Sequence, residues 1–389
     1  MALSELIIIG AGPAGLAAGI AAKVPAIILE RNPFAGKKLL LSGKGQCNFT
    51  NAIAPEEFLQ RLGEYKNFLK PAFYHFDNQA FIDLLEANAC ATFIREDGKV
   101  FPQSLQSREV RDTLLKSLYK AGQSIEYNTR VSEIAKEDDY FILSTADKRQ
   151  YRCKKLILAG GGAAYASTGS DGNCYQLAAK LGHTIIPSRP ALTNITVKNF
   201  GAFQDCAGIS LKGAELRLGK RRYSGDLLFT HQGLSGPLIL DNSHLFQPED
   251  TIQISFIQSN LLTLSTEHKA RKLSSYLQTK GIPKAVAQAL LSHISATDKA
   301  LHEYKHKDIR RICESLQQVP FTVRSLGGEG IAMGDYGGIC LKEVKAGTME
   351  SKLIKGLYFA GELLAYTLPT GGFSIQMAVS TGMLAALLK

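Results

Sequence analysis

The feature that most constrains the fold is a glycine-rich turn between a short apolar run and a helix of small residues. The apolar run is Leu6–Ile9, the turn is Gly10–Gly15 with the sequence GAGPAG, and the helix is expected over Ala14–Lys23. A second apolar run, Ala26–Leu29, ends at Glu30, twenty residues after Gly10. Strand, glycine turn, helix, strand and terminal acid in this order predict a Rossmann-type unit that binds a dinucleotide.

Each residue type in this turn has a physical role. Gly10 permits the tight turn, Gly12 lets a diphosphate approach the backbone, and Gly15 lets helix and strand pack closely. The free N–H groups and the dipole at the helix start hold phosphates. Glu30 would accept hydrogen bonds from ribose hydroxyls, which disfavours NADP at this site. The residues expected at this end of the cofactor are Gly10, Gly12, Pro13, Ala14, Gly15, Glu30 and Arg31.

The rest of the chain shows two kinds of secondary-structure pattern. Glycines gather where apolar runs end, which is typical of strand–turn–helix units in an α/β protein. Helices are expected over residues 57–90 and 107–121, and strands over 125–158. Alternating segments from about 190 predict antiparallel strands, followed by a helical stretch over about 265–318.

We therefore expect an α/β fold with a Rossmann-like domain formed by both chain ends. This domain comprises residues 1–189 and 326–389. Residues 190–325 form an inserted antiparallel β domain that carries the small helical subdomain. With 389 residues, two such domains are of ordinary size.

Composition indicates the cellular compartment in which the protein is expected. The chain has 45 Lys and Arg against 35 Asp and Glu, a net charge of +10, spread along its length. No apolar run is long enough to span a bilayer, and the N-terminus lacks the features of a signal peptide. The seven scattered cysteines never form a CxxC pair, which indicates reduced thiols and no thiolate zinc site. We expect a cytoplasmic protein that has no membrane partner.

The C-terminal end indicates which dinucleotide is bound. A predicted last strand, Gly356–Ala360, ends at Gly361-Glu362, and Thr370–Phe373 then opens an apolar helix from Ser374 to Leu388. In FAD enzymes of this fold, such a strand end delivers an acid to the ribityl or phosphate region. The helix start points at the flavin pyrimidine edge, where its partial positive charge stabilises the anionic reduced ring. FAD is therefore the expected cofactor.

Further motifs follow in order along nearly the whole chain. They are Gly36–Asn51 (GKKLLLSGKGQCNFTN), Phe101-Pro102, Leu158–Gly161, Ser167–Gly172 (STGSDG), Leu227–Pro237 (LLFTHQGLSGP) and Thr348–Leu353 (TMESKL). In these motifs the chain resembles the BaiN/YhiN-type flavoproteins. That group includes aminoacetone oxidase and lies within the glutathione-reductase-like two-dinucleotide-fold class.

The resemblance implies FAD, an inserted domain over the flavin, and a loop at residues 43–51 along the flavin. It implies further cofactor contacts at Lys37, Lys38, Ser42, Gly43, Gly45, Cys47, Asn48, Val131, Ala159, Gly160, Gly161, Gly361, Glu362, Gly371, Gly372, Phe373, Ser374 and Ile375. The chain departs from the family pattern next to the predicted ring. Ala365–Pro369 replaces an Asp-rich stretch, Ser374 stands where the family tends to have Asn, and the chain has no Trp. These departures bear on the substrate more than on the fold.

Other candidate sites are weaker. After Leu158 a second cradle would need a small residue at Tyr165 and an acid at Lys180, so NAD(P)H would have to bind directly over the flavin. His302 and His306 match HExxH, but they lie in a charged run with no third ligand, and we expect a solvated helix and no metal. The basic patch of Arg217, Lys220, Arg221 and Arg222 has only Tyr223 as a nearby aromatic and is expected to be a surface turn.

We therefore predict an FAD-dependent oxidoreductase that moves a hydride between flavin and a small organic substrate. Two cycles stay open: an oxidase of a small, aminoketone-like amine that uses O₂, and a reductase that takes NAD(P)H as a transient donor for an enone-like substrate. The missing second cradle favours the oxidase. His231 is the candidate acid or base at the flavin.

A rival hypothesis of another class is an RNA-associated or scaffold flavoprotein. It is suggested by the sequence pI of about 9.1 and the basic patch, although nucleic acid is not the expected partner. The sequence leaves the oligomeric state open.

Overall fold

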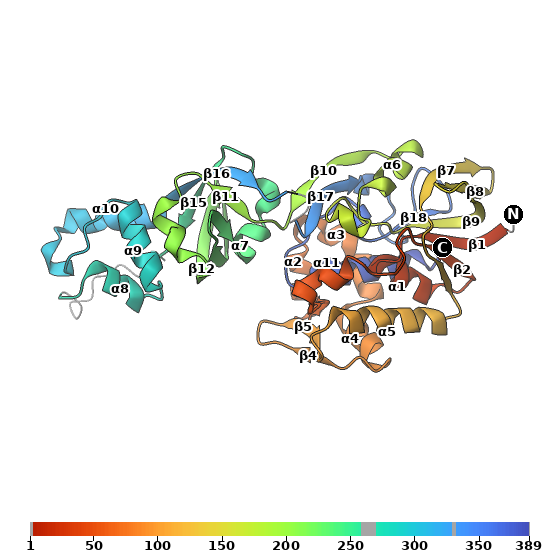
Figure 1. Ribbon diagram of the computed structural model, residues 1–389, viewed down its shortest axis with the longest axis horizontal. Helices are drawn as coiled ribbons and strands as arrows, with labels where there is room; N and C mark the ends of the chain where they lie inside the picture. The colour runs from red at the N-terminus through yellow and green to blue at the C-terminus, as the bar shows by residue number, and fades with distance from the viewer. Residues whose placement is uncertain (1–2, 258–269, 329–331, 389) are drawn as a thin grey trace. The chain divides into compact units, whose positions relative to one another are not determined.

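The computed structural model describes residues 3–257, 270–328 and 332–388 (Figure 1). The chain divides into two compact units. Met1–Arg189 and Glu329–Lys389 form the first, here called the dinucleotide unit. Pro190–Gly328 forms the second, here called the barrel unit. Each unit has its own apolar core.

A parallel sheet forms the centre of the dinucleotide unit. Its parallel strands lie in the order β6 (Ser124–Glu126), β2 (Ala26–Leu29), β1 (Leu3–Ile9), β9 (Gln150–Leu158) and β18 (Leu357–Phe359). The first half of β9 also pairs antiparallel with β8 (Tyr140–Thr145), which pairs with β7 (Val131–Glu137). The inner strands read as unbroken apolar runs because both faces of the sheet are covered. Their carboxyl ends meet at one edge, beside the glycine turn.

Helices cover this sheet and a smaller one. The turn after β1 leads into α1 (Pro13–Ala21), and α11 (Phe373–Ala385) packs against α1, where Gly382 lets its backbone reach Ala14. The other helices are α2 (Pro55–Arg61), α3 (Lys66–His75), α4 (Asn78–Glu86), α5 (Ser107–Lys120) and α6 (Asn173–Lys180). The smaller sheet has the order β3 (Thr50–Asn51), β5 (Lys99–Pro102) and β4 (Thr92–Ile94), and β10 (Ile185–Ala191) pairs with β17 (Gly334–Ile339).

The barrel unit is a closed antiparallel barrel. Its strands follow the order β11 (Ile195–Val197), β14 (Gly233–Ser235), β13 (Arg221–Phe229), β12 (Ser210–Leu218), β15 (Thr251–Ser255) and β16 (Val319–Leu326). Buried aromatic rings gather in its core, where Phe203 stacks on Phe229 and lies tilted against Phe321. The helices of this unit are α7 (Pro237–Leu240), α8 (Leu273–Thr279), α9 (Lys284–His293) and α10 (His306–Gln317).

This architecture confirms the predicted fold class, a Rossmann-type α/β domain with an antiparallel β domain. Two local expectations need correction. The helical region 57–90 is three separate helices, because the chain turns at Gly63–Tyr65 and again at Asp77. The expected helix through His302–His306 is broken, since Tyr304 and Lys305 are extended between a short 3₁₀ turn and α10. The start of the predicted helical subdomain, 265–269, lies outside the described residues.

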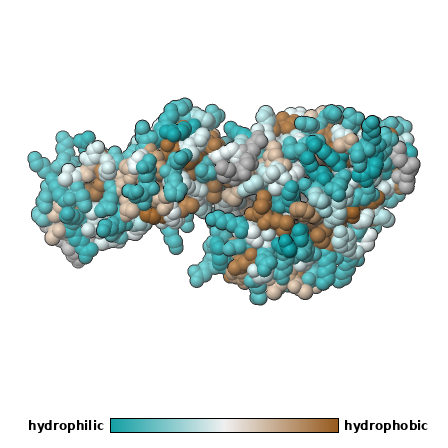
Figure 2. Space-filling view, viewed as in Figure 1, coloured by the Kyte–Doolittle hydropathy of each residue, from teal (hydrophilic) through white to brown (hydrophobic). Residues whose placement is uncertain are grey.

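No helix in the described ranges is both long and apolar enough to cross a membrane. On the face shown in Figure 2, hydrophilic side chains cover most of the α8–α10 region. All seven cysteines are free thiols, and five of them are buried.

Candidate cofactor site

The glycine turn between β1 and α1 is shaped for a ligand. Gly10 has a left-handed φ of +99°, and a Cβ there would lie 2.7 Å from the Ala159 carbonyl oxygen. A Cβ on Gly15 would lie 1.8 Å from the Gly10 oxygen. Gly12, in contrast, has nothing within 4 Å of its Cβ position. Gly10 and Gly15 therefore serve packing, whereas Gly12 leaves open space in front of the helix.

The start of α1 offers unpaired backbone donors to that space. Gly12 is the N-cap residue and supplies no capping side chain, and Pro13 begins the helix. The N–H groups of a first helical turn have no partner within the helix, and the helix dipole makes them an anion site. These features fit the diphosphate of a dinucleotide.

Glu30 at the end of β2 holds the turn in place. Its side chain is 6% exposed, and it accepts hydrogen bonds from Ala11 N (2.7 Å), Asn32 N (2.8 Å) and Asn32 Nδ2 (2.7 Å). A carboxylate has about four lone-pair sites, so it can accept a further bond. The contact between Glu30 and a ribose stays a prediction.

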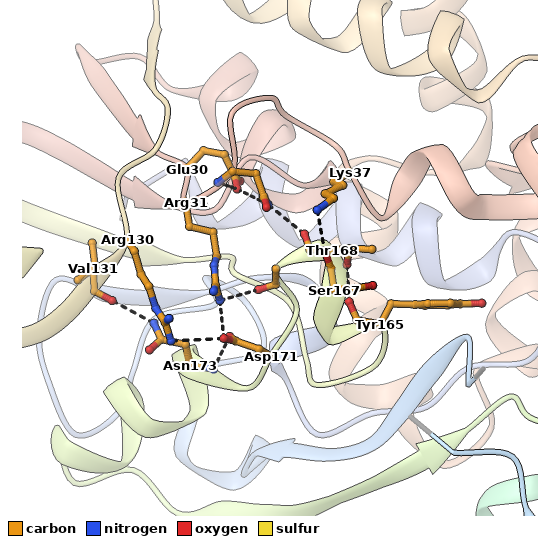
Figure 3. Close-up of polar contacts among 12 residues, drawn as sticks. Glu30, Arg31, Lys37, Arg130, Val131, Tyr165, Ser167, Thr168, Asp171 and Asn173 are labelled. Carbon is orange, nitrogen blue, oxygen red and sulfur yellow. Dashed lines mark hydrogen bonds and ion pairs between the residues drawn. The ribbon is translucent and has the colours of Figure 1, made fainter. Parts of the chain in front are cut away.

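The segment Tyr165–Asn173 is tied to the loop that follows β2 (Figure 3). Asn32 Nδ2 donates to the Thr168 oxygen at 2.9 Å, and Lys37 Nζ donates to the Ser167 oxygen at 2.7 Å. Arg31 Nη1 lies 2.5 Å from Asp171 Oδ2. Burial opposes the charge of Asp171, but Arg31 and the Asn173 N–H overcome it and hold the pKa of this carboxyl below its ordinary value. Arg31 and Lys37 are thus engaged by protein groups.

The end of β9 and the start of β7 adjoin the same segment. Asn173 Nδ2 donates to the Val131 oxygen at 3.0 Å, as drawn in Figure 3. Ala159 N donates to the Ile9 oxygen at 2.9 Å, which keeps the ends of β9 and β1 together. A Cβ on Gly160 would lie 2.3 Å from Cys174 Sγ, and one on Gly161 would lie 2.4 Å from Ser170 Oγ. The backbone here approaches its neighbours too closely for any side chain.

The loop over residues 36–51 connects to the opposite end of the chain. Lys38 Nζ lies 2.7 Å from Glu362 Oε2, a pair 324 residues apart. Ser42 Oγ donates to the Leu39 oxygen, and Gly43 and Gly45 take left-handed φ angles.

Two predicted contacts in this loop, Cys47 and Asn48, also have structural surroundings, and their contact with the cofactor stays a prediction. Burial raises the pKa of the Cys47 thiol to about 12, so the thiol is neutral at physiological pH. Asn48 Nδ2 donates to the oxygens of Thr50 (2.8 Å) and Val100 (3.0 Å). The side-chain amide of Asn48 therefore holds the loop against β5.

The C-terminal elements close against the same region. Gly361 has a φ of +76°, and its Cβ position lies 2.9 Å from Ala14 Cβ. Gly371 and Gly372 precede α11, and a Cβ on Gly372 would lie 2.6 Å from the Thr50 oxygen. No side chain caps the first turn of α11, which contains Phe373, Ser374 and Ile375. A second uncapped helix start is therefore held beside β3.

Sequence reasoning missed Asp335 on β17. This residue is 7% exposed, and its Oδ2 accepts hydrogen bonds from the backbone N–H groups of Ala163 and Ala164. Its Oδ1 is buried without a hydrogen-bond partner among the described residues. Burial raises the pKa of Asp335, although the two N–H groups and Lys38 oppose that rise. A lone acid in a glycine-rich stretch gave no sequence signal.

Three further buried atoms in this unit, Asn51 Oδ1, the Tyr366 hydroxyl and Arg152 Nε, also lack hydrogen-bond partners within the described part of the chain. Buried polar atoms without partners are rare in native proteins and commonly face a ligand or ordered water. Together with the open space at Gly12 and the two uncapped helix starts, they fit a bound dinucleotide. Gly12 and the start of α1 would hold the diphosphate, and the start of α11 would face the ring.

His231 is exposed in the turn between β13 and β14 of the barrel unit. The structure does not test its predicted role at the flavin. Among the described residues, no group of three or more His, Cys, Asp or Glu side chains is arranged to hold a metal ion. The HExxH residues lie on two different elements and cannot share one helix face.

Comparison with known proteins identifies the family. The model of the HI0933-like protein Rossmann domain matches residues 4–388, almost the entire chain. The chain belongs to the HI0933-like family. This match confirms the resemblance to the BaiN/YhiN-type flavoproteins and the assignment as an FAD-dependent oxidoreductase.

Curated relatives of this HI0933-like protein match over nearly their full length. It is 28% identical to the ribosomal RNA dihydrouridine synthase of Haemophilus influenzae, over 99% of this chain and 98% of that protein. It is also 28% identical to the Escherichia coli protein of the same name, over 97% and 96% of the two chains. The 3-dehydro-bile acid delta(4,6)-reductase of Clostridium scindens is 29% identical, over 98% of both chains.

Solved structures share the fold. The 3-ketosteroid-delta4-(5alpha)-dehydrogenase of Rhodococcus jostii RHA1 matches with a TM-score of 0.53 and 14% identity, over 99% of this chain and 97% of that one. The 3-ketosteroid delta1-dehydrogenase of Sterolibacterium denitrificans also gives 0.53, with 11% identity, over 100% and 99% of the two chains. At these identities the likeness concerns the fold alone.

Proposed function

We propose that this HI0933-like protein is an FAD-dependent reductase of a carbon–carbon double bond conjugated to a carbonyl, and that its substrate is a uridine of ribosomal RNA. The observation that carries the proposal is that the relatives' names describe the same kind of reaction, the saturation of a conjugated double bond. Dihydrouridine forms when the C5–C6 double bond of uracil, conjugated to the C4 carbonyl, is saturated. A 3-dehydro delta(4,6) steroid presents the same kind of conjugated double bond.

The sequence favoured the amine oxidase cycle. The relatives favour the reductase cycle instead. Both kinds of relative carry out, by their names, the saturation of a double bond, and neither is named for an amine. The net reaction balances as uridine + NAD(P)H + H⁺ → dihydrouridine + NAD(P)⁺. FAD, when bound, would supply the hydride-transfer chemistry that links a nicotinamide donor to the uracil double bond.

Charge favours RNA over a steroid. Residues 190–328 carry 17 Lys and Arg against 11 Asp and Glu, so the barrel unit holds more than half of the net charge in about a third of the chain. Nucleic-acid binding draws much of its affinity from such basic surfaces. The proposal thus joins the two hypotheses that the sequence kept apart, the enone reductase and the RNA-associated flavoprotein.

The chain's own residues have defined tasks in this proposal. Gly12 and the start of α1 bind the diphosphate, and the start of α11 polarises the pyrimidine edge of the ring. His231 stays the candidate general acid of the sequence prediction, for the proton that C5 of uracil takes up. His231→Gln should slow substrate reduction by about a hundredfold or more, the range for loss of a general acid, and should leave the FAD absorbance unchanged. An unchanged rate would remove His231 from the mechanism.

Two measurements test the function. The yellow protein is first mixed without oxygen with NADH, NADPH and a panel of small amines, and bleaching of the flavin band identifies the donor. The protein with its donor is then incubated with ribosomal RNA transcribed without modifications, and dihydrouridine is measured by mass spectrometry of the nucleosides. We expect a nicotinamide donor and dihydrouridine formation. Bleaching by amines alone would restore the oxidase, and reduction of a steroid dienone with no dihydrouridine would replace the substrate.

A further inference from the structure

The strongest unassigned surface is the basic hairpin, defined as Arg217, Lys220, Arg221 and Arg222. These residues lie on β12, on β13 and in the tight turn between the two strands. Lys220, Arg221 and Arg222 are exposed and Arg217 is half-buried. The hairpin belongs to the closed barrel: β12 also pairs with β15 at Arg217, whereas Arg221 and Arg222 of β13 pair with β12 alone.

The strand alternation directs the hairpin's side chains. Ala214 and Leu216 are buried in the barrel core, so Glu215 and Arg217 between them face outward. The register places Arg217 directly opposite Arg222 on one side and opposite Gln253 of β15 on the other. The outward face of these three strands therefore presents Arg217 and Arg222 together with Ser224 and Ser255, each paired with Glu215, whereas Arg221 lies at the tip opposite Leu218.

This arrangement has an electrostatic cost for the free protein. Like charges directly opposite each other across two strands are destabilising, and Arg217 faces Arg222. Glu215 approaches Arg222 at 3.6 Å, with both side chains largely exposed. In the described part of the chain, Arg217, Lys220 and Arg221 form no ion pair. An external anion that bridges the arginines would remove the repulsion.

We propose that the basic hairpin binds the phosphodiester backbone of the RNA substrate, an inference that rests on the proposed function. Guanidinium groups bind phosphate oxygens through two parallel hydrogen bonds, and neighbouring hydroxyl and amide groups add contacts. Tyr223, the nearby aromatic, faces the opposite side of β13 and packs on the barrel core. It cannot serve as a stacking platform for a base. The hairpin therefore anchors RNA without reading its sequence.

The test replaces all four basic residues with Gln in the full-length, FAD-loaded protein. The matched control replaces Lys305, Lys307, Arg310 and Arg311 with Gln, which removes the same charge from the α10 region of the same unit. Affinity for an unmodified ribosomal RNA transcript is measured over a series of salt concentrations. Each lost phosphate contact reduces the slope of log K against log salt by about 0.7–0.9.

For the hairpin variant we expect a slope reduced by about 2–3, which corresponds to three or four lost contacts. Its affinity at low salt should fall at least about tenfold, with an equal loss for an unrelated transcript of the same length. The α10 variant should keep the slope and the affinity. Both variants should retain FAD absorbance and thermal stability, which excludes misfolding.

Distinct outcomes separate the two proposals. If the wild-type protein forms dihydrouridine but the hairpin and control variants lose equal affinity and slope, the hairpin assignment is overturned and the function stands. If the wild-type protein binds RNA through the hairpin yet forms no dihydrouridine, the proposed reaction fails and the surface stands. Equal, hairpin-dependent binding to phosphatidylglycerol vesicles would overturn RNA as the occupant.

Discussion

At the scale of the residue, Gly10 and Gly12 lie two positions apart, and each lacks a side chain for a different reason. Gly10 has a left-handed φ and meets the Ala159 carbonyl, whereas Gly12 has an extended backbone and open space beside it. The spacing of the motif alone predicted that both positions need glycine. Only the packing around them separates Gly10, which the fold requires, from Gly12, which has open space beside it for the predicted cofactor.

The two alanine variants should therefore behave in opposite ways. Gly12→Ala should change the free energy of unfolding of the FAD-free protein by less than about 0.5 kcal/mol. It should weaken FAD binding by roughly tenfold or more, about 1.4 kcal/mol. Gly10→Ala should destabilise the FAD-free protein by about 1–3 kcal/mol, because it adds backbone strain and a steric clash. Urea unfolding and FAD titration measure both quantities, and equal destabilisation by the two substitutions would contradict this division of roles.

Asp335 is an acid that the fold buries at 7% exposure. Burial raises its pKa, so over the window from its ordinary value of 3.8 up to the raised value the folded chain binds more protons than the unfolded chain. Stability attributable to Asp335 is therefore lost as pH rises through that window. Asp335→Asn keeps an acceptor for Ala163 and Ala164 but removes the charge.

The FAD-free Asp335→Asn variant should be at least as stable as the wild type at neutral pH and should bind FAD more weakly. The difference in unfolding free energy between variant and wild type should grow with pH across the window and then level off. Urea unfolding over a pH series measures this difference, with a variant at exposed Asp147 as the control. A constant difference at every pH would show that the Asp335 carboxyl has no raised pKa.

At the scale of the element, the cofactor site is assembled from segments that the chain separates widely. The sequence predicted the β1–α1 turn and the start of α11, because glycines and strand ends have local signatures, and the family resemblance implied the loop over 43–51. It could not predict which groups join them. The Lys38–Glu362 pair and the bond between Thr50 Oγ1 and Gln376 Oε1 (2.6 Å) depend on tertiary packing. Asp335 was missed for the same reason.

A double-mutant cycle measures the connection between the two chain ends. Both side chains of the Lys38–Glu362 pair are about a quarter exposed, at 23% and 24%, and they lie 2.7 Å apart. We expect Lys38→Met and Glu362→Gln to show a coupling energy of about 0.5–1 kcal/mol in urea unfolding of the FAD-free protein. Raising the salt concentration should reduce the coupling. Strictly additive effects would mean that the ion pair contributes nothing to joining these elements.

At the scale of the whole molecule, the sequence predicted the strands of the barrel unit but not the closure of the barrel. The inserted region was predicted from its alternating segments, and it is a closed six-stranded barrel. Closure depends on pairs such as β11 with β16, which are more than a hundred residues apart. Such pairing leaves no local signal. The broken HExxH segment shows the converse, since a sequence match does not place two histidines on one helix.

Separate cores predict separate responses to the cofactor. Every cofactor-binding residue predicted here lies in the dinucleotide unit, and the barrel unit has its own apolar core. A ligand stabilises the state that binds it, by about 2.7 kcal/mol at a hundredfold excess over Kd. FAD at that excess should therefore slow hydrogen exchange of the slowest amides in β1, β9 and α11, and leave those of β12, β13 and β15 unchanged. Equal slowing in the barrel strands would mean that the two units unfold as one.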